Sequence, residues 1–283
     1  MILVIDAINK DKHGAVLEDM FRLRARVFAD RLGWDVQIRD GMEMDAFDAL
    51  DPAYLVGLDE EDRVVSCVRL LQTTGPHMLS DIFSDILQGE PPMRAPTLWE
   101  STRFCVDTDR LSTQDRGHGS VARATSELMC GTLEFAQRSG ISDIITVIDP
   151  VMNRVLKRSD NAPYGYVGNI VQMGKTKALA ALLDTTDERI NRLRAFAGIE
   201  GSVFVDEEAL IARMARRAQP APQKAAIAPD VLAQYCLEQL SAAQSEQDMN
   251  AALNLAQAVL GARQHDGTSP PQADIPYGTG YRH

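Results

Sequence analysis

Three arginines stand where the pattern of the sequence predicts buried side chains. Arg24 shares one stripe of a predicted helix with Phe28 in RLRARVFADRLGW. Arg69 interrupts the apolar strand VVSCVRLL, and Arg103 lies among apolar neighbours in WESTRF. A buried guanidinium is unfavourable unless carboxylates pair with it or it faces a cleft. Each of these arginines is therefore expected to have an acidic partner or a ligand.

Four acids could supply those partners. Glu43, Asp45 and Asp48 crowd into the six residues EMDAFD, and Glu100 stands three residues before Arg103. We expect the arginines and these acids to meet in one cleft, because paired burial satisfies both signs of charge. Taken alone, such charges favour a structural ion-pair network, with a ligand-binding cleft as the alternative.

The elements that must position these charges alternate between strands and helices. MILVIDAINK is expected to be an edge strand, and 142–149, apolar on both faces, a central strand. Further strands are expected at 53–58, 63–72, 97–107, 166–174 and 177–183, and helices near 14–33, at 78–87 and 120–138, from Asp149-Pro150 onward, and at 185–198. Residues 35–52, which hold the acidic cluster, are expected to form a loop. This order indicates an α/β fold.

The composition changes at RRAQPAPQKAAIAP, where Pro, Ala and Gln indicate a linker. The interpretation has four parts: a catalytic domain at 1–215, a linker at 216–229, a helical hairpin at 230–264 and a disordered tail at 265–283.

The overall charge excludes some classes of partner. Lys and Arg number 29 against 40 Asp and Glu, a net charge of −11, which disfavours nucleic acid and anionic membranes. No apolar run approaches a membrane span, and the four cysteines lack metal-type spacing, so reduced thiols in a cytoplasmic protein are expected. The five histidines show no metal-ligand spacing, and no metal is expected.

Over roughly residues 1 to 200, the sequence resembles the acyl-homoserine lactone synthases, the LuxI-type autoinducer synthases. The matching residues are Arg24, Phe28 and Trp34 in RLRARVFADRLGW, Glu43, Asp45 and Asp48 in EMDAFD, Arg69, Phe83, and Glu100 and Arg103 in WESTRF. The resemblance implies a three-layer α/β/α sandwich like that of the GNAT N-acyltransferases, with a V-shaped cleft splitting a mixed sheet. The extension after residue 216 lies outside the resemblance.

The resemblance also implies a reaction. S-adenosylmethionine would be the acyl acceptor, and is thus a substrate rather than a cofactor, and an acyl thioester on acyl carrier protein would be the donor. Lactone closure would then expel methylthioadenosine. Glu43 or Glu100 would act as base, and Arg69 and Arg103 would complete the catalytic set. The residues expected on the S-adenosylmethionine side are Arg24, Phe28, Trp34, Asp45 and Asp48.

Other positions are assigned more specific roles. The resemblance places Phe83 and Thr146 in the acyl pocket. In the family, a Thr at the position of Thr146 goes with 3-oxo-acyl substrates. The alternative for Thr146 is a structural hydroxyl that bonds to nearby backbone. Arg154, Lys157 and Arg158 share a helix face, either solvated or docking an acidic carrier protein. The apolar faces of the C-terminal helices are expected to self-associate.

Two alternatives remain open. RGHGSVA at 116–122, two glycines before a helix, faintly resembles a coenzyme A-gripping loop and would favour a GNAT-like transferase acting from acyl-CoA or aryl-CoA on another amine. The second alternative is a regulator that binds acyl carrier protein without catalysis.

Overall fold

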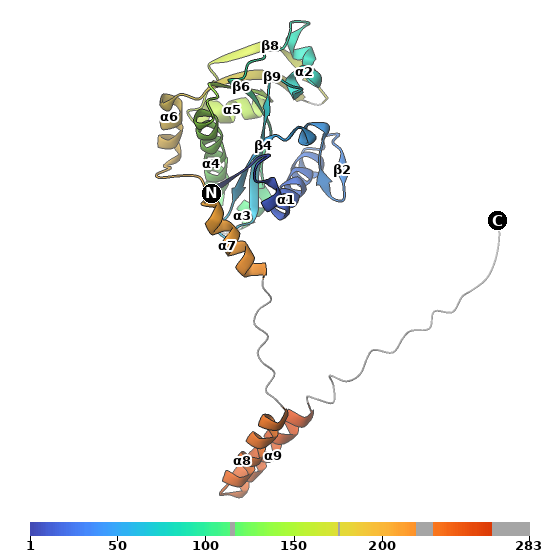
Figure 1. Cartoon of the computed structure of the whole chain (residues 1–283), viewed down its shortest axis with the longest axis vertical. Coiled ribbons are helices and arrows are strands. Elements are labelled where there is room, and N and C mark those ends of the chain that lie inside the picture. Colours follow the sequence, from blue (N-terminus) through green and yellow to red (C-terminus); the bar gives the residue numbers. More distant parts are fainter. Residues whose placement is uncertain (114–116, 175, 219–228, 262–283) are drawn as a thin grey trace, which may run out of the picture. The chain divides into compact units, whose positions relative to one another are not determined.

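Figure 1 shows a computed structural model of the chain, which describes residues 1–113, 117–174, 176–218 and 229–261. The chain divides into two compact units, Met1–Arg217 and Ala218–His283. The tail expected at 265–283 and most of the linker expected at 216–229 lie outside the described residues. The linker assignment is wrong in its first three residues and in its last, because one helix continues to Ala218 and the next begins at Pro229.

A mixed sheet of seven strands, in the order β1-β4-β5-β6-β7-β9-β8, forms the centre of the first unit. The strands are β1 (Ile2–Ile5), β4 (Ala53–Leu58), β5 (Val64–Gln72), β6 (Leu98–Val106), β7 (Asp143–Ile148), β8 (Gly165–Met173) and β9 (Thr176–Asp184), with a separate pair β2 (Ile38–Arg39) and β3 (Met42–Glu43). The predicted edge strand β1 and central strand β7 occupy those places.

The sheet splits between β6 and β7. These two strands are parallel, and they pair only from Leu98 with Asp143 to Ser101 with Thr146. Beyond that point each strand continues without the other, β6 to Val106 and β7 to Ile148. The V-shaped opening expected in a mixed sheet therefore lies here.

Helices cover both faces of the sheet. Figure 1 shows α4 (Gly117–Arg138), α5 (Pro150–Arg158) and α6 (Asp187–Ala197) on one side, with α1 (Gly14–Arg24) on the other. Leu128 and Leu133 of α4 pack with Ile144 of β7, whereas Met20 and Leu23 of α1 pack in a separate cluster. The remaining helical segments are η1 (Lys10–Lys12), η2 (Ala25–Arg31), η3 (Ala46–Leu50), α2 (Met78–Asp81), η4 (Ser84–Leu87), α3 (Thr108–Thr113) and α7 (Glu207–Ala218).

Several segments differ from expectation. Helix α3 was not expected, and the helix expected at 78–87 is divided into α2 and η4. The single helix expected near 14–33 changes at Ala25 from α-helical to π-helical, and this second part is η2. The loop expected at 35–52 contains β2, β3 and η3, because Asp45 caps η3 by accepting the Phe47 N–H at 2.9 Å. Helix α7 was not expected; Arg213 fastens it to Asp62 at 2.8 Å.

The second unit contains the expected helical pair, α8 (Pro229–Ala242) and α9 (Glu246–Gly261). Cys236 and Ala252 are buried in it, while large apolar side chains are exposed, including Tyr235, Leu237 and Leu253. Within the described part of the chain, none of the helices combines the length and apolar character that crossing a bilayer requires.

Candidate active site

Arg24 is completely buried and contacts two acids of the expected cluster. Its Nε donates to Glu43 Oε2 at 2.5 Å, and its two terminal nitrogens bind both oxygens of Asp48 at 2.8 and 2.9 Å. The guanidinium reaches these acids because α1 packs against β3 and β5. The bidentate geometry fixes both partners.

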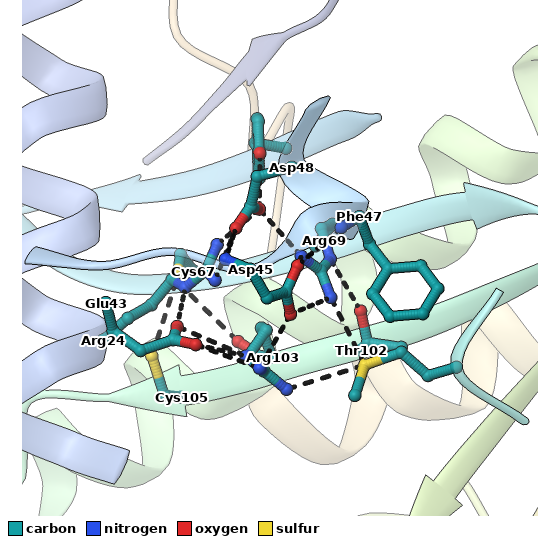
Figure 2. A network of polar contacts seen from close by, with 12 residues as sticks. Arg24, Glu43, Asp45, Phe47, Asp48, Cys67, Arg69, Thr102, Arg103 and Cys105 are labelled. Carbon is teal, nitrogen blue, oxygen red and sulfur yellow. Dashed lines mark hydrogen bonds and ion pairs between the residues drawn. The ribbon is translucent and has the colours of Figure 1, made fainter. Parts of the chain in front are cut away.

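Arg69 is the second fully buried arginine, and it extends the same network. It binds Asp45 with two nitrogens, at 2.5 and 2.9 Å, and Asp48 with one of them at 2.8 Å. Its Nε donates to Thr102 Oγ1 at 3.0 Å. Figure 2 shows these side chains converging from β5, β6 and the segment before β4.

Arg103 completes the network from an irregular position in β6. Thr102 pairs with Arg69 and Cys105 with Cys67, so two residues of β6 lie opposite one residue of β5. Arg103 takes a φ of 55° in this bulge, and its Nη2 reaches Glu43 Oε1 at 2.9 Å and Asp45 Oδ2 at 2.7 Å. Three guanidiniums and three carboxylates are thus interlocked, as expected.

Burial and ion pairing shift the pKa values of Arg24, Asp48 and Arg69. Burial alone would raise the pKa of Asp48, but the hydrogen bond and charge of Arg24, with the charge of Arg69, hold it well below its usual range. Desolvation would lower the pKa of Arg24, yet Asp48 and Glu43 raise it above the ordinary value. Asp48 and Arg24 are therefore both ionised at neutral pH.

Glu100 is not part of this ion-pair network, contrary to expectation. Its oxygens accept the backbone N–H groups of Met78 at 2.6 Å and Leu79 at 2.7 Å, at the start of α2. Burial raises the pKa of Glu100 to about 7, although the two N–H groups oppose the shift. The expected fourth acid is thus held by the backbone at the start of α2, with a pKa raised toward neutrality.

A cavity of about 300 Å³ passes through the split in the sheet. On the side of α1 and η2 it is lined by Phe28, Trp34 and Arg103, and on the side of α4 and α5 by Met129 and Leu156, among others. Arg103 lines it, whereas Arg24, Arg69, Glu43 and Glu100 are not among its lining residues. Arg103 is therefore the network arginine in the cavity wall, and its carboxylate partners hold its guanidinium in place.

The aromatic residues expected at the site lie at the mouth of this cavity. The rings of Phe28 and Trp34 stack 5.1 Å apart at 25°, and the guanidinium of Arg103 lies 5.5 Å from the centre of the Phe28 ring. Phe83 is half-buried and also lines the cavity. These rings form an apolar entrance beside the ion pairs.

Thr146 lines the cavity, as expected, but its proton is engaged. It is buried, and its hydroxyl donates to the backbone carbonyl of Ser101 at 3.0 Å. This bond lies where β6 and β7 separate. Its interpretation as a residue that recognises 3-oxo-acyl groups stays a prediction.

Arg154, Lys157 and Arg158 are all exposed on α5, away from the ion-pair network. The predicted glycine-rich segment 116–122 begins outside the described residues and continues into α4. All four cysteines are free, and no group of three or more His, Cys, Asp or Glu side chains in the described part of the chain could hold a metal.

Several contributors to the site were not singled out from the sequence. Tyr54 donates its hydroxyl to Asp48 at 2.7 Å, and Met78 accepts from Arg69 through its sulfur at 3.3 Å. Asp149 lines the cavity while capping α5. The polar hydroxyl of Tyr54 within the apolar strand AYLVGL was a usable signal; the other two positions carried none.

Comparisons with known proteins agree with this geometry. The autoinducer synthase family matches residues 9–193. A probable acyl-homoserine-lactone synthase of Sinorhizobium fredii is 36% identical over 193 residues, which cover 68% of this chain and 91% of the relative. The acyl-homoserine-lactone synthase of Agrobacterium fabrum is 37% identical over 182 residues, which cover 64% of this chain and 85% of the relative.

Solved structures give the same result. MesI, a CoA-dependent acyl-homoserine lactone synthase, matches with a TM-score of 0.63 and 30% identity over 73% of this chain and all of its own. BjaI, another CoA-dependent synthase, solved with SAM and isopentyl-CoA, matches with a TM-score of 0.64 and 26% identity over 76% and 99%. The fold and these relatives define an acyltransferase. The chain belongs to the autoinducer synthase family, and its activity is that of an acyl-homoserine-lactone synthase.

Proposed function

We propose that the protein transfers an acyl group from a thioester to the α-amine of S-adenosylmethionine and then closes the lactone. The observation that carries this proposal is the cavity through the split sheet, which has a charged, aromatic mouth and an apolar interior. BjaI has been solved with SAM and isopentyl-CoA together, which supports two substrates meeting in such a site.

The mouth of the cavity is suited to S-adenosylmethionine. The stacked rings of Phe28 and Trp34 offer a surface for the adenosyl group, and Asp45, partly exposed, can favour the sulfonium charge. Arg103 would hold the methionyl carboxylate, because it is the network arginine that lines the cavity. Arg24 and Arg69 would act as positioning residues that fix Glu43, Asp45 and Asp48.

Glu100 is the better candidate for the general base. Glu43 accepts hydrogen bonds from both Arg24 and Arg103, so protonating it would weaken two charge-assisted contacts. The pKa of Glu100, raised to about 7, is matched to taking a proton near neutral pH. Since Glu100 does not line the cavity, it would act through water. Backbone N–H groups of the β6 bulge would stabilise the oxyanion.

After acyl transfer, the methionyl carboxylate attacks its own γ-carbon and the C–S bond breaks, releasing methylthioadenosine. This displacement requires orientation of the carboxylate, because a sulfonium is already a good leaving group. The role proposed for Arg103 supplies that orientation.

The exposed cations on α5 support acyl carrier protein as the donor. Arg154, Lys157 and Arg158 form a local basic face on a chain whose net charge is −11, and carrier recognition would need such a face. We expect no cofactor and a cytoplasmic location. The deciding experiment supplies S-adenosylmethionine with acyl thioesters of carrier protein or coenzyme A and measures lactone and methylthioadenosine by mass spectrometry. Absence of both products with every donor would refute the proposal.

The α8–α9 pair would mediate self-association. Two helices of 14 and 16 residues bury too little apolar surface to be stable alone, and Tyr235, Leu237 and Leu253 remain exposed. Light scattering should therefore give a larger assembly for the full chain than for a chain ending at Ala218. Equal assembly states would assign the apolar side chains another role.

A further inference from the structure

A polar side chain lies in the wall of the cavity where the acyl group would end. Asn161 is 1% exposed and lines the cavity with apolar residues such as Leu156 and Leu183. A buried amide that makes only part of its hydrogen bonds is unfavourable in such surroundings unless something else completes them. Its neighbours therefore decide what it can bind.

Asn161 lies toward the end of the cavity where β6 and β7 are still paired, away from the point where they separate. The β6–β7 pair opens beyond Thr146, toward Arg103 and Ile148, and it is closed where Trp99 pairs with Ile144. Ile144 in turn pairs with Leu183 at the end of β9. Asn161 is tied to this same end, because Arg189 bonds both Asn161 and Asp184.

The distance available between the two ends suits an acyl chain. Ile148 and Ile144 are four residues apart on β7, which corresponds to about 13 Å along a strand. The cavity wall between them includes Thr146, Leu133 and Val155. A chain entering at the split and running toward Ile144 would therefore bring its distal end to Asn161.

Arg189 sets the orientation of the Asn161 amide. The Nη1 of this buried arginine donates to Asn161 Oδ1 at 3.0 Å and to the Ala162 carbonyl at 2.8 Å, while Asp184 holds the rest of the guanidinium. The oxygen of the amide is thus occupied, and among the described residues Nδ2 donates no hydrogen bond. An amide N–H facing a cavity requires an acceptor.

Two threonines on the wall do not offer a donor in the same way. The hydroxyl of Thr132 donates to the Leu128 carbonyl at 2.7 Å, and that of Thr146 to the Ser101 carbonyl at 3.0 Å. Their protons are directed into the backbone. Ser101 lies where β6 and β7 separate, so at the end of the wall near Ile144 the Asn161 amide is the donor presented to a ligand among the described residues.

We propose that Asn161 Nδ2 donates a hydrogen bond to an oxygen at the distal end of the acyl group, so that the enzyme selects hydroxylated or keto acyl donors over unsubstituted ones. The inference rests on the proposed function, in which this cavity holds the acyl chain. An unsubstituted chain would desolvate the amide without replacing its hydrogen bond, and this difference creates the selectivity.

The test compares thioesters of increasing chain length in three forms: unsubstituted, with a terminal hydroxyl, and with a ketone next to the terminal carbon. At the length that reaches Asn161, the wild type should favour both oxygenated forms by about threefold to tenfold in kcat/KM. Asn161→Leu should remove the preference. Asn161→Asp still pairs with Arg189 but presents an acceptor, so it should keep the hydroxyl donor and lose the ketone donor.

Asn153→Leu is the matched control, because Asn153 bonds Tyr166 on the exposed side of α5 and is not among the cavity-lining residues. Its preference should equal that of the wild type. Equal kcat/KM for oxygenated and unsubstituted donors at every length would overturn the inference, as would an Asn161→Leu variant that loses all donors in proportion. Lactone formation itself would remain in both cases, whereas its complete absence refutes the proposed function instead.

Discussion

The carboxylate of Glu100 accepts the backbone N–H of Met78 at 2.6 Å, which joins the middle of β6 to the start of α2. The same Met78 accepts hydrogen bonds through its sulfur from Arg69 and Arg103. Met78 therefore connects Glu100 to the ion-pair network, although Glu100 itself makes no ion pair with the three arginines. The charge of Arg69 still lowers the pKa of Glu100, although the two side chains share no hydrogen bond.

Glu100→Gln should lower acyl transfer by about 10²-fold to 10⁴-fold, because the amide keeps the shape of the side chain and loses its basicity. Methylthioadenosine release under saturating substrates measures the effect, and cooperative melting checks the fold. In the wild type, the rate should rise with pH through about 7, the pKa of Glu100, and this limb should vanish in the variant. Turnover near that of the wild type would remove Glu100 from the mechanism.

Stability should also depend on the charge of Glu100. Its pKa is raised from 4.5 to about 7 in the folded protein, so between these pH values the folded state retains a proton that the unfolded state has lost. The contribution of Glu100 to the free energy of unfolding should therefore fall as pH rises from 4.5 and level off above about 7. Urea unfolding of wild type and Glu100→Gln across this range measures the difference. Parallel profiles would contradict the assigned shift.

Arg69→Met should destabilise the protein by about 3–5 kcal/mol, because it leaves Asp45 and Asp48 without one of their buried partners. Arg22→Met is the control, since Arg22 pairs with Glu18 and Asp19 on an exposed helix face, where such pairs contribute about 0–1 kcal/mol. Urea midpoints give both values. Similar losses in the two variants would show that burial of the network adds nothing.

Reversing the charges of Arg154, Lys157 and Arg158 to Glu should raise KM for a carrier-protein donor by about tenfold or more, while leaving a coenzyme A donor unchanged. Arg192→Glu, an exposed reversal on α6, is the control and should affect neither donor. If all donors respond equally, the basic face of α5 does not dock the carrier.

Thr146→Val should reduce the use of 3-oxygenated acyl donors by about threefold to tenfold and spare the unsubstituted chain. The Thr146 proton already serves the Ser101 carbonyl, so a 3-hydroxyl can donate to the Thr146 oxygen, whereas a 3-oxo group must compete for the proton. The 3-hydroxy donor should therefore depend more strongly on Thr146. Equal loss with all donors would mark the residue as structural.

The sequence was sufficient to predict the ion pairs because a buried guanidinium has few solutions. Arg24, Arg69 and Arg103 each needed an acid, and the cluster at Glu43, Asp45 and Asp48 could provide it. The prediction that Glu100 joins the ion-pair network was wrong, because its partners are backbone N–H groups at the start of α2. Every residue except proline carries such a donor, so the sequence does not indicate which one Glu100 binds.

Other features depended on long-range packing. Asn161 follows a helix and resembles any polar loop residue until Arg189, 28 positions later, fixes its amide. Helix α7 follows a bridge between β1 and Phe204 and binds Asp62 through Arg213, contacts that local periodicity cannot reveal. The seven strands of the main sheet and most of the longer helices, by contrast, were predictable, because their apolar residues recur at the spacing of a strand or a helix.

The bulge at Arg103 adds one residue to β6 relative to its partner strand β5. Thr102 before it and Cys105 after it face the same side of the sheet, toward Arg69 and Cys67, although their spacing of three would place them on opposite sides of a regular strand. Deleting one residue would yield an uninterrupted strand whose flanking side chains keep their partners. It would also relieve a left-handed, non-glycine backbone that costs about 1–2 kcal/mol. Arg103 is thus a residue that the strand does not need for its pairing, and its left-handed conformation places its guanidinium in the wall of the cavity.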